Sequence, residues 1–135
     1  MKRVLVTVFT FLFTLFAAIG FVGCQKSVTV NGEYVVIVAK DVSADTTLLE
    51  YMEALQSEGE LSFTVENGMI TAIDGKENAD DFSSCWMLYT SDTEFSTAEY
   101  GTVEYDGKTY QSAIFGAETL VLKEGEAYVW AYVTF

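Results

Sequence analysis

Hydrophobic and polar residues alternate with a period of two in several short runs, which predicts a chain rich in β-strands. Asn67-Gly68 and Asp106-Gly107 lie between such runs and favour tight hairpin turns, and the segment 28–38 is either one strand or a hairpin through Asn31-Gly32. The predicted strand segments are 28–38, 61–66, 69–73, 85–90, 103–105, 109–115 and 127–135. The last segment is apolar on both faces, which is typical of a central strand covered on both sides.

One segment, 45–59, has the period of an amphipathic helix instead. Thr47 and Glu50 have the spacing of a capping box, and Gly59 suits the left-handed position that follows the last turn. The apolar stripe of this helix consists of Leu48, Leu49, Met52 and Leu55. Many short strands and one helix predict an α+β fold, in which the helix packs on a mixed or antiparallel sheet.

The first 23 residues follow neither pattern, because Lys2 and Arg3 precede an uncharged, mostly apolar run that ends at Cys24. A basic start, an apolar centre and small residues near the end are typical of a signal peptide. The run is also just long enough for a membrane-spanning helix of about 20 residues. A buried helix of the folded domain is disfavoured, because the run has no polar face. We therefore expect an N-terminal signal helix over residues 1–23.

The end of this run, Phe21-Val22-Gly23-Cys24, resembles the lipobox of bacterial lipoproteins, in which the cysteine receives a diacylglycerol thioether and becomes the mature N-terminus. The resemblance implies lipidation at Cys24 and anchoring to the outer side of the bacterial cell membrane. Residues 24–33 would then be a short tether or the start of the first strand, and 34–135 the folded domain. The alternative for Cys24 is a disulfide with Cys85, the other cysteine of the chain.

The charge of the chain restricts its partners. Twenty acidic residues face seven basic ones, and cleavage before Cys24 would change the net charge from −13 to −15 by removing Lys2 and Arg3. Nucleic acid is an improbable partner, since its binding depends on cationic side chains. An anionic membrane surface would repel the domain within a Debye length of about 8 Å. We therefore expect the lipid to hold the protein at the membrane.

The residue types argue against an enzyme. Histidine, the usual general base and the commonest metal ligand, is absent. No serine lies in a Gly-x-Ser-x-Gly or Ser-x-x-Lys motif, although carboxylate pairs remain able to act as acid and base. The acidic loop around Asn78, Asp80 and Asp81 lacks the spacing of a calcium-binding loop. We expect a non-enzymatic protein without a metal site.

Aromatic residues gather on the predicted strands of the second half, and stacked rings present flat faces to sugars, peptides or corrin rings. The candidate ligand-binding residues are Trp86, Tyr89, Tyr128, Trp130 and Tyr132. The alternative is that they pack in the core, above all the two tryptophans. A tyrosine more often brings its hydroxyl to the surface, so an exposed tyrosine patch on the last strand would be the site.

Three stretches that follow the helix, ITAIDGK at 70–76, CWMLYT at 85–90 and LKEGEAYVWAYV at 122–133, resemble an uncharacterised bacterial domain family. That family is related to the C-terminal domain of transcobalamin and intrinsic factor, and the resemblance covers roughly residues 34–134. It implies a β-grasp-like sheet packed on one helix. It also implies binding of a planar ligand such as a corrinoid, so cobalamin is the cofactor it suggests.

Two classes of function follow from these observations. The first is a membrane-anchored, extracytoplasmic ligand-binding or adhesion module for a corrinoid or another planar ligand. The second is a structural or interaction protein of the cell surface that binds a protein partner and no small molecule. Addition of a strand at an open sheet edge would serve the second class.

Overall fold

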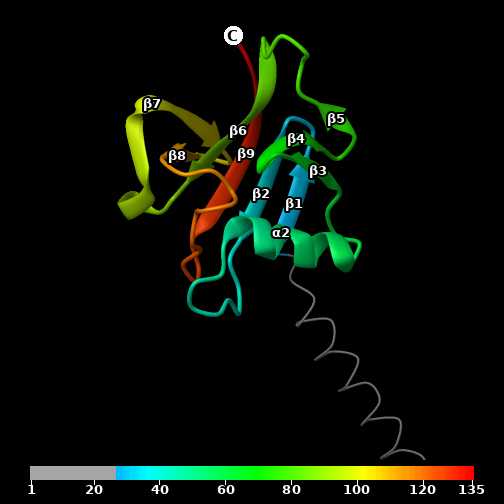
Figure 1. Ribbon diagram of the computed structural model, residues 1–135. Helices are drawn as coiled ribbons and strands as arrows, with labels where there is room; N and C mark the ends of the chain where they lie inside the picture. The colour runs from blue at the N-terminus through cyan, green and yellow to red at the C-terminus, as the bar shows by residue number, and fades with distance from the viewer. Residues whose placement is uncertain (1–26) are drawn as a thin grey trace, which may run out of the picture.

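A computed structural model describes residues 27–135. The expected signal helix over 1–23 and the lipidation site at Cys24 lie outside these residues. The elements in chain order are β1 (Val28–Asn31), β2 (Tyr34–Val38), α2 (Leu48–Ser57), β3 (Phe63–Glu66), β4 (Met69–Ile73), β5 (Lys76–Glu77), β6 (Ser84–Thr90), the 3₁₀ turn η1 (Thr93–Phe95), β7 (Ser96–Tyr105), β8 (Lys108–Ala113) and β9 (Ala127–Thr134) (Figure 1).

The prediction of an α+β, β-grasp-like fold is wrong. The described residues are mostly β, with 49% in strands and bridges and 12% in helical turns, and they form two antiparallel sheets with a single α-helix. The main cause of the error is β7, which is ten residues long where only 103–105 were predicted. Its first half is rich in Ser, Thr and Glu and has no apolar alternation, so its strand character left no periodic signal.

The larger sheet has six strands in the order β1-β2-β9-β6-β8-β7. The last strand, β9, lies between β2 and β6, where Tyr128 is opposite Ile37 on one side and Thr90 on the other. Tyr128 and Val129 point to opposite faces and are both fully buried. The prediction of a central strand covered on both sides is therefore confirmed.

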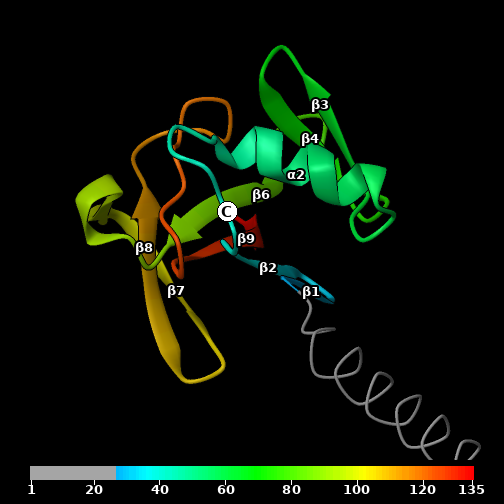
Figure 2. The same cartoon turned by 90° about the horizontal axis from the view of Figure 1, so that it is seen from below.

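The smaller sheet, β3-β4-β5, consists of the β3–β4 hairpin and the two-residue strand β5, and it lies beside α2 (Figure 2). Asn67 and Gly68 form its turn with φ angles of 53° and 78°. Positive φ at both central residues defines the primed turn that matches strand twist. The predicted hairpin at Asn67-Gly68 is confirmed.

Helix α2 covers one face of the six-stranded sheet. The hydroxyl of Thr47 caps the first turn by accepting a hydrogen bond from the Glu50 amide at 3.3 Å. Leu48, Met52 and Leu55 are buried against residues of both sheets, including Ile37 and Tyr128. The predicted helix and its cap are confirmed. No helix within residues 27–135 is both long and apolar enough to span a membrane.

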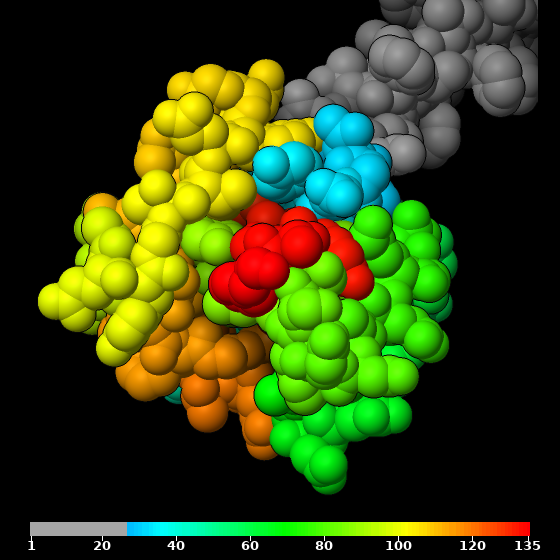
Figure 3. All heavy atoms as spheres, turned by 90° about the horizontal axis from the view of Figure 1, so that it is seen from above, coloured from blue at the N-terminus to red at the C-terminus, as the bar shows by residue number. Residues whose placement is uncertain are grey.

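The other face of the large sheet is concave. Tyr34 on β2 and Tyr105 on β7 lie with ring centroids 5.2 Å apart, although three strands separate β2 from β7. In a flat sheet those strands would be about 19 Å apart, at about 4.8 Å per strand. The sheet therefore curls until its edges meet, and Figure 3 shows the yellow β7–β8 hairpin against the cyan β1–β2 hairpin. The enclosed cluster is Tyr89, Tyr110, Val129 and Ala131, with Tyr34, Val36, Met87, Val103, Tyr105, Ala127 and Val133 partly buried around it.

Candidate functional site

Four of the five aromatic candidates lie together, but in the core. Trp86, Tyr128 and Trp130 are buried beneath α2, and Tyr132 packs edge-on against Trp86 with centroids 5.3 Å apart. Tyr89 is buried on the opposite, concave face of the sheet. The structure thus forms no exposed tyrosine patch on the last strand, and the core alternative describes the positions of Trp86 and Trp130.

Internal hydrogen bonds hold three of these four side chains in place, whereas the buried Trp130 Nε1 has no partner among residues 27–135. Trp86 Nε1 donates to the carbonyl of Lys76 at 2.8 Å, and the Tyr132 hydroxyl donates to the carbonyl of Glu77 at 2.8 Å. The Tyr128 hydroxyl accepts from the backbone amide of Lys123 at 2.9 Å. Side chains whose polar atoms are used in this way stabilise the fold and have little left to offer a ligand.

A hollow of about 460 Å³ opens on the concave face of the large sheet. Its floor is apolar and comes from Val36 and Val38 on β2 and Ala127 on β9. The β7–β8 hairpin forms one wall, which carries Tyr105, Asp106, Lys108 and Tyr110. The volume lies within the range of small-molecule sites, which combine an apolar lining with a few polar groups.

Tyr110 is the most unusual residue of this hollow. The residue is 6% exposed, yet its hydroxyl has no hydrogen-bond partner among residues 27–135. The hydroxyl oxygen itself keeps some accessible surface. Burial raises the pKa of Tyr110, and the nearby Asp106 and Tyr105 raise it further. The hydroxyl is therefore a neutral hydrogen-bond donor at physiological pH, and a buried polar group without a partner normally has one supplied by water or a ligand.

The turn of the β7–β8 hairpin carries two opposite charges over the mouth of the hollow. Asp106 and Gly107 have φ angles of 50° and 75°, so this is again a primed turn, and Tyr105 is paired with Lys108 across it. Neither Asp106 nor Lys108 forms an ion pair in the described part of the chain. Both charges are therefore available to a bound molecule.

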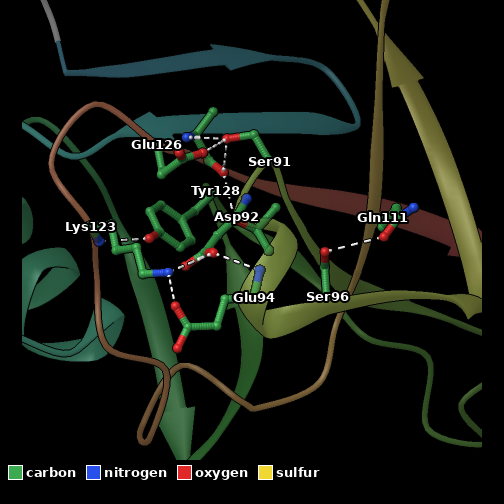
Figure 4. Close-up of polar contacts among 10 residues, drawn as sticks. Ser91, Asp92, Glu94, Ser96, Gln111, Lys123, Glu126 and Tyr128 are labelled. Carbon is green, nitrogen blue, oxygen red and sulfur yellow. Dashed lines mark hydrogen bonds and ion pairs between the residues drawn. The ribbon is translucent and has the colours of Figure 1, made fainter.

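A second polar group, centred on Asp92, adjoins the hollow through Ser91 (Figure 4). Asp92 is 3% exposed, and its Oδ1 accepts from Lys123 Nζ at 3.1 Å and from the Glu94 amide at 3.0 Å. Lys123 also pairs with the Glu94 carboxylate. These bonds raise the pKa of Lys123, with the Glu94 contact the larger cause. The group ties the segment after β6 to the segment before β9.

A further hollow of about 360 Å³ lies on the small sheet and is lined by Glu66, Glu77, Asp80 and the exposed ring of Phe82, among others. Within residues 27–135, no three His, Cys, Asp or Glu side chains are close enough together to hold a metal ion. The carboxylates of this hollow show no second feature that identifies a ligand.

No family model, curated protein or solved structure matches this chain. The likeness to the transcobalamin-related family thus stays a prediction that these comparisons leave untested. Sequence reasoning missed the residues of the large hollow, although it predicted the hairpin at Asp106-Gly107. The missing information is the curl of the sheet, which brings this turn over β2.

Proposed function

We propose that this protein is a lipid-anchored, extracytoplasmic module that binds a small molecule in the hollow of its curled sheet and catalyses no reaction. The observation that carries the proposal is Tyr110, whose side chain is almost wholly buried in the wall of the hollow while its hydroxyl stays accessible and has no partner in the described chain. A ligand that accepts its hydrogen bond would satisfy this donor, and a typical bond of this kind contributes about 0.5–1.5 kcal/mol.

The location is supported by the lipobox-like Phe21-Val22-Gly23-Cys24 and by the few residues between Cys24 and the start of β1 at Val28. At about 3.3 Å per residue, such a tether is at most about 15 Å long. A lipid on Cys24 would therefore keep the hollow within reach of molecules that diffuse close to the membrane.

Filling the hollow tests the proposal. Val38→Phe places a larger side chain in the hollow and reduces its volume, whereas Val65→Phe makes the same change at an exposed position of the small sheet. We expect the neutral dye Nile red to gain fluorescence with the wild type and with Val65→Phe, and Val38→Phe to bind it at least about tenfold more weakly, or about 1.4 kcal/mol. Equal binding by all three proteins, or none by the wild type, would refute the proposal.

A corrinoid is the specific ligand that the family resemblance suggests. Titration with cyanocobalamin tests it, because the corrin absorbance shifts when the ring enters a protein site. An unchanged spectrum at saturating protein would rule out this ligand and would leave the smaller-ligand proposal standing.

The alternative function, an interaction protein of the cell surface, is favoured by the edge strand β1. No strand pairs with its outer edge in the described chain, and Val30 there is 41% exposed. A partner strand could add to this edge. Under this alternative, Val30→Lys abolishes cross-linking to surface proteins on intact cells, whereas Val38→Phe leaves the cross-linking unchanged.

A further inference from the structure

The mouth of the hollow combines charges that a ligand of one sign would not satisfy. Asp106 and Lys108 are two residues apart on the same turn, and both line the hollow. A simple anion would face Lys108 but be repelled by Asp106, and a simple cation would meet the reverse. A molecule with both charges a few ångströms apart satisfies the two side chains at once.

The tripeptide Asp-Gly-Lys also occurs at a second turn, and there the lysine is paired. The turn alone therefore does not decide whether its lysine has a partner. Asp74-Gly75-Lys76 has nearly the same φ angles at its first two residues, 51° and 79°, as Asp106-Gly107-Lys108. Lys76, however, forms an ion pair with Glu33 at 3.6 Å and lies over the ring of Tyr132. Lys108 has no such partner among residues 27–135, so its charge is free to act at the hollow.

The rest of the hollow favours a particular chemistry for the uncharged part of the ligand. Val36, Val38 and Ala127 offer only apolar surface, which favours an apolar side chain. The Tyr110 hydroxyl, held neutral by its surroundings, can donate a hydrogen bond to a carboxylate or a carbonyl oxygen. Donors of this kind next to a lysine are suited to a carboxylate end.

We propose that the hollow binds an α-amino acid or a short peptide with an apolar side chain. In this arrangement Lys108 and Tyr110 bind the carboxylate, Asp106 binds the ammonium group, and the floor holds the side chain. The proposal rests on the proposed function, since it names the ligand class of the same hollow.

Three matched probes test it by calorimetry on the full chain: L-leucine, its analogue without the carboxylate (3-methylbutylamine) and its analogue without the ammonium group (4-methylpentanoate). We expect leucine to bind at least about tenfold more tightly than either analogue, since each analogue leaves one charge at the mouth unpaired.

Two variants assign each charge to its residue. Lys108→Gln should weaken leucine by about tenfold without weakening 3-methylbutylamine, and Asp106→Asn should weaken leucine similarly without weakening 4-methylpentanoate. The matched controls are Asp74→Asn and Lys76→Gln in the second Asp-Gly-Lys turn, which should bind all three probes as the wild type does.

The outcomes distinguish an error in the ligand class from an error in the proposed small-molecule binding. If the three probes bind equally, if none binds, or if the variants at 106 and 108 behave like those at 74 and 76, the amino-acid class is wrong. The hollow remains a binding site in those cases when Val38→Phe still excludes Nile red. Failure of both the dye and the probes would refute the proposed function as well.

Discussion

At the scale of single residues, a few buried polar side chains stabilise the fold by forming hydrogen bonds with backbone groups. Tyr128 is fully buried, and its hydroxyl is the acceptor for the Lys123 amide. Thr90 is also buried, donates to the carbonyl of Ala127 at 2.8 Å and accepts from the Asp92 amide at 3.1 Å. The amides of Lys123 and Asp92 depend on these side-chain acceptors, so removing an acceptor deprives the amide of this bond, whereas the Ala127 carbonyl also accepts from the Ser91 amide at 3.0 Å.

Replacement of Tyr128 by Phe should therefore lower the free energy of unfolding by about 1–3 kcal/mol, because the Lys123 amide loses its acceptor. Urea denaturation measures this change. Tyr132→Phe on the same strand is the control and should cost less, since the Glu77 carbonyl that it frees lies on an exposed residue that water can reach. An equal loss in both variants would show that the buried hydrogen bond has no special weight.

The Glu124 carboxylate gives the fold a dependence on pH. It accepts hydrogen bonds from the amides of Asp41 at 2.9 Å and Val42 at 3.1 Å, and these two bonds lower its pKa below the usual 4.5. A carboxylate with a lowered pKa in the folded state stabilises the fold above its unfolded pKa, and this contribution is lost as the pH falls through the folded value.

We therefore expect the melting temperature of the wild type to fall slightly more between pH 6 and pH 3 than that of Glu124→Gln. Thermal melts followed by circular dichroism measure this difference. Glu53→Gln, on the exposed side of α2, should follow the wild type. Parallel curves for Glu124→Gln and the wild type would contradict the assigned role.

At the scale of elements, the turns are the most exactly specified parts of the chain. Gly68 has a φ of 78°, and a Cβ on it would clash with Glu118 Oε2, so a loop that precedes β9 packs against the β3–β4 turn. Gly116 has an ordinary backbone and open space around it. The two glycines allow the same substitution to be compared with and without strain.

Gly68→Ala should destabilise the protein by about 1–2 kcal/mol, because a residue with a side chain is strained in the left-handed region and because the Glu118 carboxylate must move. Gly116→Ala should be neutral or slightly stabilising, since it only restricts the unfolded chain. Chemical denaturation of both variants measures the difference. A stable Gly68→Ala would mean that the turn changes type without cost.

The same scale shows what could be predicted from the sequence. Helix α2 and the hairpins at Asn67-Gly68 and Asp106-Gly107 were predicted correctly, because their signals are local, and the hairpin at Asn31-Gly32 is one of the two alternatives for 28–38. The predicted strand 109–115 ends early, since β8 stops at Ala113 and Ile114 and Phe115 are exposed. Strand β7 was mostly missed, because it is an edge strand whose polar residues face water and carry no apolar period.

At the scale of the whole molecule, the curl of the large sheet was beyond sequence reasoning. It depends on contacts such as Tyr34 with Tyr105, which are distant in the chain and belong to no local pattern. The candidate site follows from the curl, so Tyr105 and Tyr110 could not be singled out from the other aromatic residues. The five residues that were chosen have the right chemistry, but four lie beneath α2 or beside its core and Tyr89 is buried on the other face.

The proposed attachment to the membrane also concerns the whole molecule, and it yields one prediction. We expect the intact mass of the protein from the membrane fraction to exceed that of the chain starting at Cys24 by several hundred daltons, as a diacylglycerol thioether requires. Cys24→Ser should lose this mass and leave the membrane, whereas Cys85→Ser should keep both. A mass lower by two protons, restored in Cys85→Ser, would instead indicate the disulfide.

The central position of β9 has a consequence for how the protein is made. Without that strand, β1–β2 and the β6–β8–β7 group share no ladder of hydrogen bonds, because β9 alone lies between them. The ribosome produces both halves before it reaches residues 127–134. A growing chain thus holds two unfinished pieces that join only when β9 pairs with both, and under the proposed export this delay would keep the chain open for passage through an export channel.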